Sequence, residues 1–305
     1  VQGVPLGFVD AQCWARDPKE FGKKAKRAAL PIEDKESYRW IKSYQAVAAV
    51  QKRNPQVQLV SVGDREADIY ELFEEALRDP AGPGLLVRAV HDRKVQDEHR
   101  RLFDTVQAQP IAGYQSIHLP RQKNRPAREA KLAIHFAAVT LCPPKSKPGL
   151  APLAVQMVFA QEVDPPAQVE PIEWALLTTI KVDNFEQACE KLAWYTQRWG
   201  IEVFHRTLKS GCRVEDRQLG HGDHLQACLA IDMVIAWRIH HMTKLGREVP
   251  DLPAEAYFDR DECDVLIARE RRDLKRPIDA PAPTLYEAIR MIAKLGGFIG
   301  RKSDG

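Results

Sequence analysis

Residues 194–209 predict a helix that is apolar on nearly every side and carries one narrow polar stripe. At about 100° per residue, Tyr195, Arg198, Glu202 and Lys209 fall within an arc of roughly 60°. A carboxylate beside a phenol and two cations suits a site where a hard metal ion meets a phosphate group. We therefore expect a buried helix whose stripe faces a cleft. The alternative is an ordinary helix-surface ion pair between Arg198 and Glu202.

A strand, a turn and a helix are predicted between Val57 and Leu77. The run Val57–Val62 is typical of a buried strand, Gly63 turns the chain, and Asp64 opens the helical segment. Asp64 therefore stands at the carboxyl end of a strand, where open α/β sheets bind their ligands. The pattern predicts an α/β fold with a candidate catalytic carboxylate at the edge of its sheet.

Five strand-like segments separate these two motifs. They alternate or run apolar and are divided by Pro-rich connectors, which is typical of a β-rich region. We predict strands at Leu85–Val90, Tyr114–Leu119, Lys131–Phe136, Leu153–Ala160 and Trp174–Ile180. Helices are expected outside this region, at Asp34–Asn54 and Leu225–Leu245.

Together the two motifs resemble the DDE transposases of the bacterial insertion-sequence-four family, which are of the cut-and-paste type. The run Asp-Arg-Glu-Ala-Asp at 64–68 is similar to the segment with the family's second catalytic aspartate. The spacing of Tyr195, Arg198, Glu202 and Lys209 matches the signature around its catalytic glutamate. The likeness reaches from near residue 7 to past residue 240 and also includes Gly113–Gln115, Lys123–Arg128, Trp174 and Leu176–Thr178.

The resemblance implies a ribonuclease-H-like core, interrupted by a β-rich insertion and followed by a helical C-terminal tail. It implies a DNA transposase that hydrolyses a phosphodiester at a transposon end and then transfers the strand. Mg²⁺, with Mn²⁺ as a substitute, would be bound by Asp64 and Glu202, in keeping with two-metal chemistry. The phosphate at the transposon end would be held by Tyr195, Arg198 and Lys209.

Further DNA contacts are expected from one tryptophan and from basic side chains. Trp174 matches the position where the family inserts an indole to hold a flipped base, although a Trp before two leucines is also typical of a core. Arg88 ends a predicted strand and by resemblance points toward the phosphate cluster. Residues 85–131 hold ten Lys or Arg against five acids. This stretch suits a DNA backbone or else a solvated face, and its expected phosphate contacts are Lys123, Arg125 and Arg128.

The resemblance also predicts an incomplete site. The family's first catalytic aspartate lies upstream of the Gly7–Val9 strand, in a stretch that this sequence does not contain. Asp10 is not catalytic in the family pattern, and we interpret it as a polar residue at a strand end. Two other hypotheses stay open. One is a non-enzymatic, truncated transposase that binds DNA or inhibits the full-length enzyme, and the other is a glycosidase with Asp64 and Glu202 as its acid and base.

The C-terminal region predicts a helix that pairs two molecules. Thr284 and Glu287 have the spacing of a capping box, and the apolar stripe that follows ends at Gly296. In the resembled family this region joins two transposase molecules on DNA, which predicts a homodimer. A helix packed on its own core is the alternative.

The resemblance implies a cytoplasmic bacterial protein associated with the nucleoid, and the composition agrees with a soluble protein of that kind. The chain has 305 residues, 44% hydrophobic residues and a formal net charge of +3. Its six cysteines include no Cys-x2-Cys pair, which speaks against zinc, and the sequence predicts neither a membrane span nor a signal peptide. We expect a core in two parts at 1–80 and 183–245, an insertion at 81–182, and a linker with the dimerisation region at 246–305.

Overall fold

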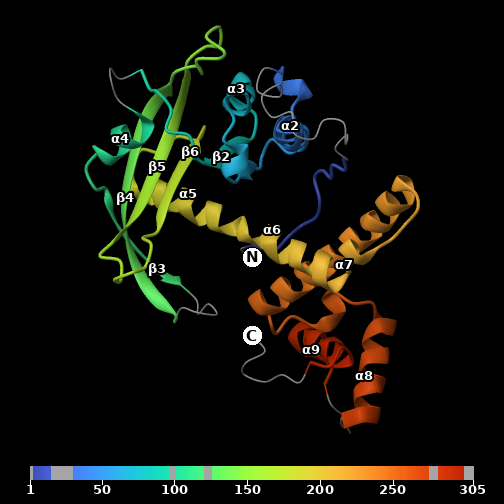
Figure 1. Ribbon diagram of the computed structural model, residues 1–305. Coiled ribbons are helices and arrows are strands. Elements are labelled where there is room, and N and C mark those ends of the chain that lie inside the picture. Colours follow the sequence, from blue (N-terminus) through green and yellow to red (C-terminus); the bar gives the residue numbers. More distant parts are fainter. Residues whose placement is uncertain (1–2, 15–29, 97–100, 120–125, 275–280, 299–305) are drawn as a thin grey trace. The chain divides into compact units, whose positions relative to one another are not determined.

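The computed structural model describes residues 3–14, 30–96, 101–119, 126–274 and 281–298. Contacts divide the chain into two compact units. Residues 9–198 form the sheet unit, and residues 1–8 with 199–305 form the helical unit. Figure 1 shows a mixed α/β chain with a helical C-terminal part, as expected. The ribonuclease-H-like core and the four domain ranges stay predictions.

A curled six-stranded sheet, in the order β1-β2-β6-β5-β4-β3, forms the centre of the sheet unit. The first pair, β1 and β2, is parallel, and the other neighbouring pairs are antiparallel. The five strands predicted between the two motifs are confirmed, and they continue the sheet that begins with β1. The strands are β1 (Val60–Gly63), β2 (Gly84–Arg88), β3 (Gly113–Leu119), β4 (Arg128–Leu141), β5 (Leu153–Val163) and β6 (Glu173–Thr178).

Both faces of the sheet are apolar. Consecutive residues of a strand point to opposite faces, so a buried pair of neighbours contributes one side chain to each face. Such pairs lie in the three central strands β2, β5 and β6, where all six side chains have no exposed surface: Leu86 and Val87, Val158 and Phe159, Leu176 and Leu177. A sheet of this kind needs a helical cover on each side.

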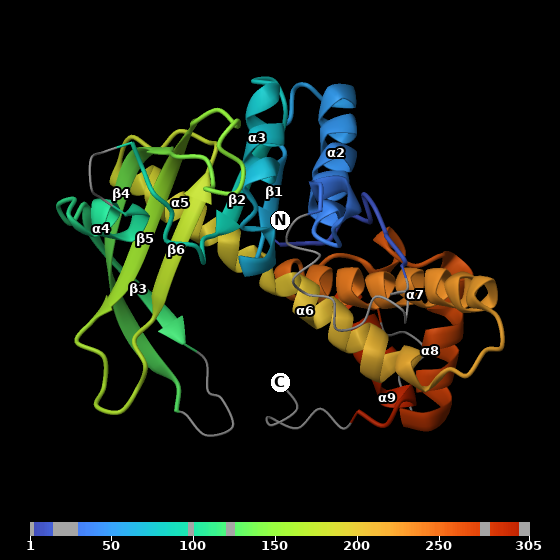
Figure 2. The ribbon, with the colours of Figure 1, turned by 45° about the horizontal axis from the view of Figure 1, so that its top comes forward.

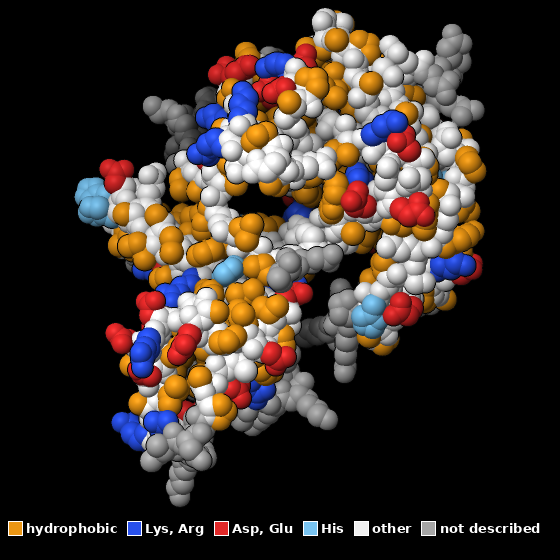
Figure 3. All heavy atoms as spheres, turned by 180° about the vertical axis from the view of Figure 1, so that it is seen from behind, with side chains coloured by type: hydrophobic (Ala, Val, Ile, Leu, Met, Phe, Trp, Pro, Cys, Tyr) orange, Lys and Arg blue, Asp and Glu red, His pale blue; other side chains and the backbone are white. Residues whose placement is uncertain are grey.

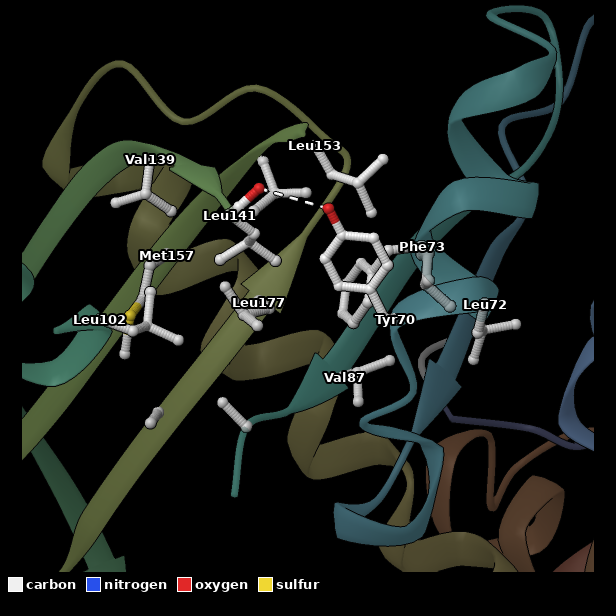
Figure 4. Packing of buried hydrophobic residues seen from close by; sticks show 14 of the residues in the cluster. Tyr70, Leu72, Phe73, Val87, Leu102, Val139, Leu141, Leu153, Met157 and Leu177 are labelled. Atoms are coloured by element: carbon white, nitrogen blue, oxygen red, sulfur yellow. Dashed lines mark hydrogen bonds between the residues drawn. The ribbon is translucent and has the colours of Figure 1, made fainter. Parts of the chain in front are cut away.

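Helices α2, α3 and α4 cover one face of the sheet. In Figure 4, Tyr70 and Phe73 of α3 pack against the strand residues Val87 and Leu177. The Tyr70 hydroxyl donates one hydrogen bond that is shared between the carbonyl oxygens of Ala151, at 2.7 Å, and of Leu141, at 3.3 Å. This shared bond ties α3 to the β4–β5 connection. The helices are α2 (Tyr38–Arg53), α3 (Tyr70–Arg78) and α4 (Leu102–Gln107).

Helix α5 (Phe185–Gln197) covers the opposite face, as Figure 2 allows the reader to follow. Asn184 caps its first turn, since its side chain accepts the N–H of Gln187 at 2.9 Å. The buried side of α5 contributes Ala188, Leu192 and Tyr195 to a core with strands β2, β4, β5 and β6. The apolar side of α5 therefore fixes where its C-terminal end lies on the sheet.

The helical unit is built on α7 and α9. The capping box is confirmed: the Glu287 N–H donates to Thr284 Oγ1 at 3.3 Å, and the Thr284 N–H donates to the Glu287 carboxylate at 3.0 Å. No helix in the described ranges has the length and apolar character needed to cross a membrane. The helices are α6 (Trp199–Arg206), α7 (Gly222–Glu248), α8 (Arg260–Leu274) and α9 (Leu285–Leu295), with a π-helical turn η4 (Thr207–Gly211).

A buried ion pair joins Arg128 of β4 to Glu162 of β5. One nitrogen of Arg128 donates to Glu162 Oε2 at 3.0 Å and another to Oε1, and the Ile172 N–H donates to Oε2 at 3.1 Å. The Glu162 side chain is 2% exposed. Its hydrogen bonds with Arg128 lower the pKa of Glu162, although burial alone would raise it.

We expect acidification to lower the free energy of unfolding of the wild type and to raise that of Arg128→Met. Because the pKa of Glu162 is lowered in the folded protein, the unfolded chain binds more protons between the two values. The stabilising effect is present above the unfolded pKa of about 4.3 and is lost as the pH falls through the lowered folded pKa. Without Arg128 the buried carboxylate has a raised pKa, so the variant is destabilised at neutral pH and recovers stability on acidification. Urea unfolding across this pH range measures both effects.

The matched control is Arg53→Met, which removes an exposed guanidinium at the C-terminal end of α2. This control should keep the wild-type pH profile. Identical profiles for Arg128→Met and the wild type would show that the pair does not contribute to stability.

Candidate functional site

Asp64 and Arg88 lie at the carboxyl ends of two neighbouring parallel strands. Asp64 directly follows β1, and Arg88 is the last residue of β2. Gly63 is opposite Val87 in the register, so both strands end at the same edge of the sheet. The structure thus brings together a carboxylate and a guanidinium that the sequence placed 24 residues apart.

Asp64 is fixed by the turn that follows it. Its Oδ1 accepts the Glu66 N–H at 2.9 Å and caps the 3-10 turn η3 (Arg65–Ala67). The expectation that Asp64 opens the long helix is wrong, because α3 begins only at Tyr70.

Asp68 has a structural role that the sequence did not reveal. Its side chain has no exposed surface, and its carboxylate accepts the N–H groups of Val90, at 2.7 Å, and His91, at 2.9 Å, and pairs with Arg93. Arg93 also donates to the Asp68 carbonyl oxygen at 2.8 Å. The last residue of the Asp-Arg-Glu-Ala-Asp run therefore holds the chain that leaves β2. These partners lie 22 to 25 residues away, where no local pattern points to them.

Trp174 and Tyr195 meet on the face of the sheet that α5 covers. Trp174 lies two residues before Leu176, the register partner of Arg88, so it is at the same end of the sheet. Its ring meets the Tyr195 ring edge-on, with centroids 6.3 Å apart. Arg88 Nη2 donates to the Glu173 carbonyl oxygen at 3.1 Å. Trp174 is half-buried against the core, and its base-holding role stays a prediction.

Arg198 also belongs to this group of residues. Its guanidinium carbon lies 5.9 Å from the centre of the Tyr195 ring. The sheet unit therefore collects five of the predicted site residues at one end of its sheet: Asp64, Arg88, Trp174, Tyr195 and Arg198. A carboxylate with two guanidinium groups and two aromatic rings is suited to a phosphate ester and a base.

The helix predicted between residues 194 and 209 is interrupted. α5 ends at Gln197, and the Arg198 N–H bonds three residues back, to Tyr195 at 3.1 Å. After α6 the chain forms η4, where the Cys212 N–H reaches back five residues to Thr207 at 3.0 Å. The predicted arc assumed an unbroken α-helix, and across these two changes it stays a prediction.

The expected burial of this helix is wrong for α6. Trp199 is 67% exposed and Ile201 is 42% exposed, so only Phe204 of α6 is buried. The sequence has apolar residues all round the helix, but the chain divides at Arg198: α5 belongs to the sheet unit and α6 to the helical unit.

Glu202 and Lys209 belong to the helical unit. Glu202 is exposed on α6. Lys209 Nζ lies 2.9 Å from Glu215 Oε1, and both side chains are more than half exposed. Exposed pairs of this kind contribute little stability, so a phosphate group can replace Glu215 as the partner of Lys209 at small cost.

The remaining predicted residues have different surroundings. Arg128 is engaged with Glu162, as described above, and Asp10 is exposed and accepts a hydrogen bond from Gln12 Nε2 at 2.8 Å. Lys123 and Arg125 lie outside the described residues. Their contacts with DNA stay predictions.

The donor chemistry of Asp64 and Glu202 fits a hard cation. Mg²⁺ is usually bound through one or two carboxylates together with substrate phosphates and water. Within the described part of the chain, no group of three or more His, Cys, Asp or Glu side chains is placed to hold a metal ion. Metal binding by Asp64, in the sheet unit, and by Glu202, in the helical unit, stays a proposal.

We predict that Gly63→Ala destabilises the protein by about 1–3 kcal/mol and displaces Asp64. A Cβ at Gly63 would overlap the Cβ of Ala67, a residue with no exposed surface that cannot move aside. Gly149→Ala is the matched control, because nothing lies within 4 Å of its added Cβ. Urea unfolding should separate the two variants. Equal stabilities would show that the turn before Asp64 is not tightly packed.

A comparison with known families adds evidence from the C-terminal region. Residues 234–305 match the family model of the transposase Tn5 dimerisation domain. The match includes most of α7 with α8 and α9, whose core is formed by Ala254, Phe258, Cys263, Leu285 and Ala288. A dimerisation domain supports homodimer formation, and this one supports a transposase.

Proposed function

We propose that this chain is a DDE-type transposase of the insertion-sequence-four group that cuts a DNA phosphodiester and transfers the strand. The match of residues 234–305 to a transposase dimerisation domain carries the proposal. It is supported by Asp64 and Glu202, which stand at the positions of two of the family's catalytic carboxylates. Residues 9–198 would then supply most of the chemical groups and residues 234–305 the contact between two copies.

In this proposal the residues at the end of the sheet bind the DNA end. Arg88 and Arg198 hold phosphate oxygens, since guanidinium groups suit bidentate contacts with phosphate. Tyr195 adds its hydroxyl, and the indole of Trp174 offers a stacking surface for a flipped base. Lys209 exchanges its bond with Glu215 for a bond with phosphate.

Asp64 and Glu202 would hold Mg²⁺, and the bound metal would supply activation of the attacking oxygen and stabilisation of the leaving one. The role of Asp64 depends on η3, which holds its carboxylate at the strand end through the Glu66 N–H. The role of Glu202 depends on its exposed position on α6. Both side chains must be ionised to bind the metal.

We predict that Glu202→Gln and Asp64→Asn each lower Mg²⁺-dependent nicking of DNA by at least about 100-fold. Mutation of a residue that only supports a metal ligand already lowers metal affinity or activity by about 10–100-fold, and these two residues would be the ligands themselves. DNA affinity and unfolding should remain close to the wild type. Glu255→Gln, at an exposed position of the helical unit, is the control and should keep full nicking. Full nicking by Glu202→Gln would exclude this role. A wild type that binds DNA but does not nick it would favour the non-enzymatic alternative.

We expect Lys209→Gln to weaken DNA binding and to reduce the slope of log affinity against log salt by about 1. The reason is the loss of one phosphate contact with its released counterion. Fluorescence anisotropy at several salt concentrations measures both quantities. Arg247→Gln removes an exposed charge from α7 and should leave the slope unchanged. A slope that stays the same in Lys209→Gln would remove Lys209 from the DNA contact.

A further inference from the structure

A cleft of about 540 Å³ in the sheet unit is lined by an excess of basic side chains. This basic cleft lies between four segments that are distant in sequence: the approach to α2, the start of α3 at residues 68–71, the chain after β2, and the β4–β5 connection. Its carboxylates are Asp68 and Glu71. Its Lys and Arg residues are Lys35, Arg93, Lys94, Arg101, Lys145 and Lys147.

Both carboxylates of the basic cleft are already neutralised. Asp68 is buried and bound by Arg93 and two backbone N–H groups. Glu71 pairs with Lys147. Lys94 and Lys145 are exposed, and no carboxylate among the described residues pairs with either of them. The cleft therefore has a net positive charge that its own acids do not balance.

The walls of the basic cleft are held in place before any ligand arrives. The backbone of Lys94 accepts the Cys142 N–H at 2.9 Å, which joins the chain after β2 to the β4–β5 connection. Tyr70 ties the same connection to α3 through Ala151. Arg93, which lines the cleft, donates to the Asp68 carboxylate and to the Asp68 carbonyl oxygen, so its guanidinium is held in place. Preorganised donors bind an anion at a lower entropic cost.

Phosphate is the anion that fits this surface. It spreads negative charge over several oxygens and matches both the planar guanidinium and the compact ammonium group. Pro143 and Pro144 add apolar surface beside the cations, which suits the sugar of a nucleic-acid backbone. Figure 3 shows one face of the molecule, on which the described basic side chains lie among acidic ones. Concentration of unbalanced charge in one cleft distinguishes it from an ordinary solvated surface.

We propose that the basic cleft binds phosphate groups of a DNA backbone, as a contact additional to the site at the end of the sheet. The identification of DNA as the source of the phosphate rests on the proposed function. The cleft itself rests on charge and geometry within residues 9–198.

The test uses the full chain with Lys94→Gln and Lys145→Gln combined. Both side chains are exposed, so their replacement should not unfold the protein, unlike that of Arg93, which pairs with buried Asp68. The control combines Lys52→Gln with Arg53→Gln. These exposed residues lie at the C-terminal end of α2, about 20 Å along the helix from its first turn. Like the cleft variant, the control removes two positive charges from the sheet unit.

Anisotropy with a short fluorescent duplex of arbitrary sequence gives affinity and salt slope. The cleft variant should bind roughly tenfold or more weakly at about 0.1 M salt, with a slope reduced by about one to two. The control should match the wild type. An equal loss in both variants, or wild-type affinity in the cleft variant, would overturn the proposal.

Calorimetric titration with ATP separates the two sources of phosphate. If the cleft variant keeps its DNA affinity and loses only ATP binding, the ligand is a free phosphate compound and DNA is overturned as the source. That result leaves the proposed function intact, since the wild type still binds DNA. A wild type that binds no DNA at all would overturn the proposed function, while ATP binding lost in the cleft variant would still establish a phosphate site.

Discussion

The sheet of residues 9–198 must be covered on both faces, and the rest of the unit depends on this requirement. Leu86 and Val87, like Leu176 and Leu177, are neighbours that are buried on opposite sides. Helices α2, α3 and α4 cover one side and α5 the other. Because α5 is bound to the sheet by its apolar side, its last turn reaches the edge where β1 and β2 end. The same packing that stabilises the fold thus places Tyr195 beside Trp174.

Buried charges organise the connections around this sheet. Asp68 holds the chain after β2 through Arg93 and two backbone N–H groups, and Glu162 holds Arg128. Each carboxylate is satisfied by several donors, as a buried charge must be. Asp68 also holds Arg93, and both residues line the basic cleft. Charge in this chain is concentrated locally, although its net value is only +3.

Strands and helix ends that follow from a local sequence pattern could be predicted from the sequence. Features that depend on contacts between residues far apart in the chain could not. Alternation identified the five strands from β2 to β6, and the capping box located the start of α9 at Leu285. The same local rules failed at Arg198 and Thr207, where hydrogen bonding changes within what looks like one helix. The basic cleft was missed because Lys35, Lys94 and Lys145 come together only through tertiary structure.

The account depends on Asp64 and Glu202 acting on one metal ion, which a crystal structure with Mn²⁺ and a DNA end would test most directly. We expect anomalous scattering from an ion bound by both carboxylates, at distances near the 2.0–2.1 Å typical of Mg²⁺. Arg88, Arg198 and Lys209 should contact the phosphates beside it. Carboxylates more than about 10 Å apart with DNA bound, and no ion between them, would contradict the proposed catalytic site, since paired metals act only about 3.5–4 Å from each other.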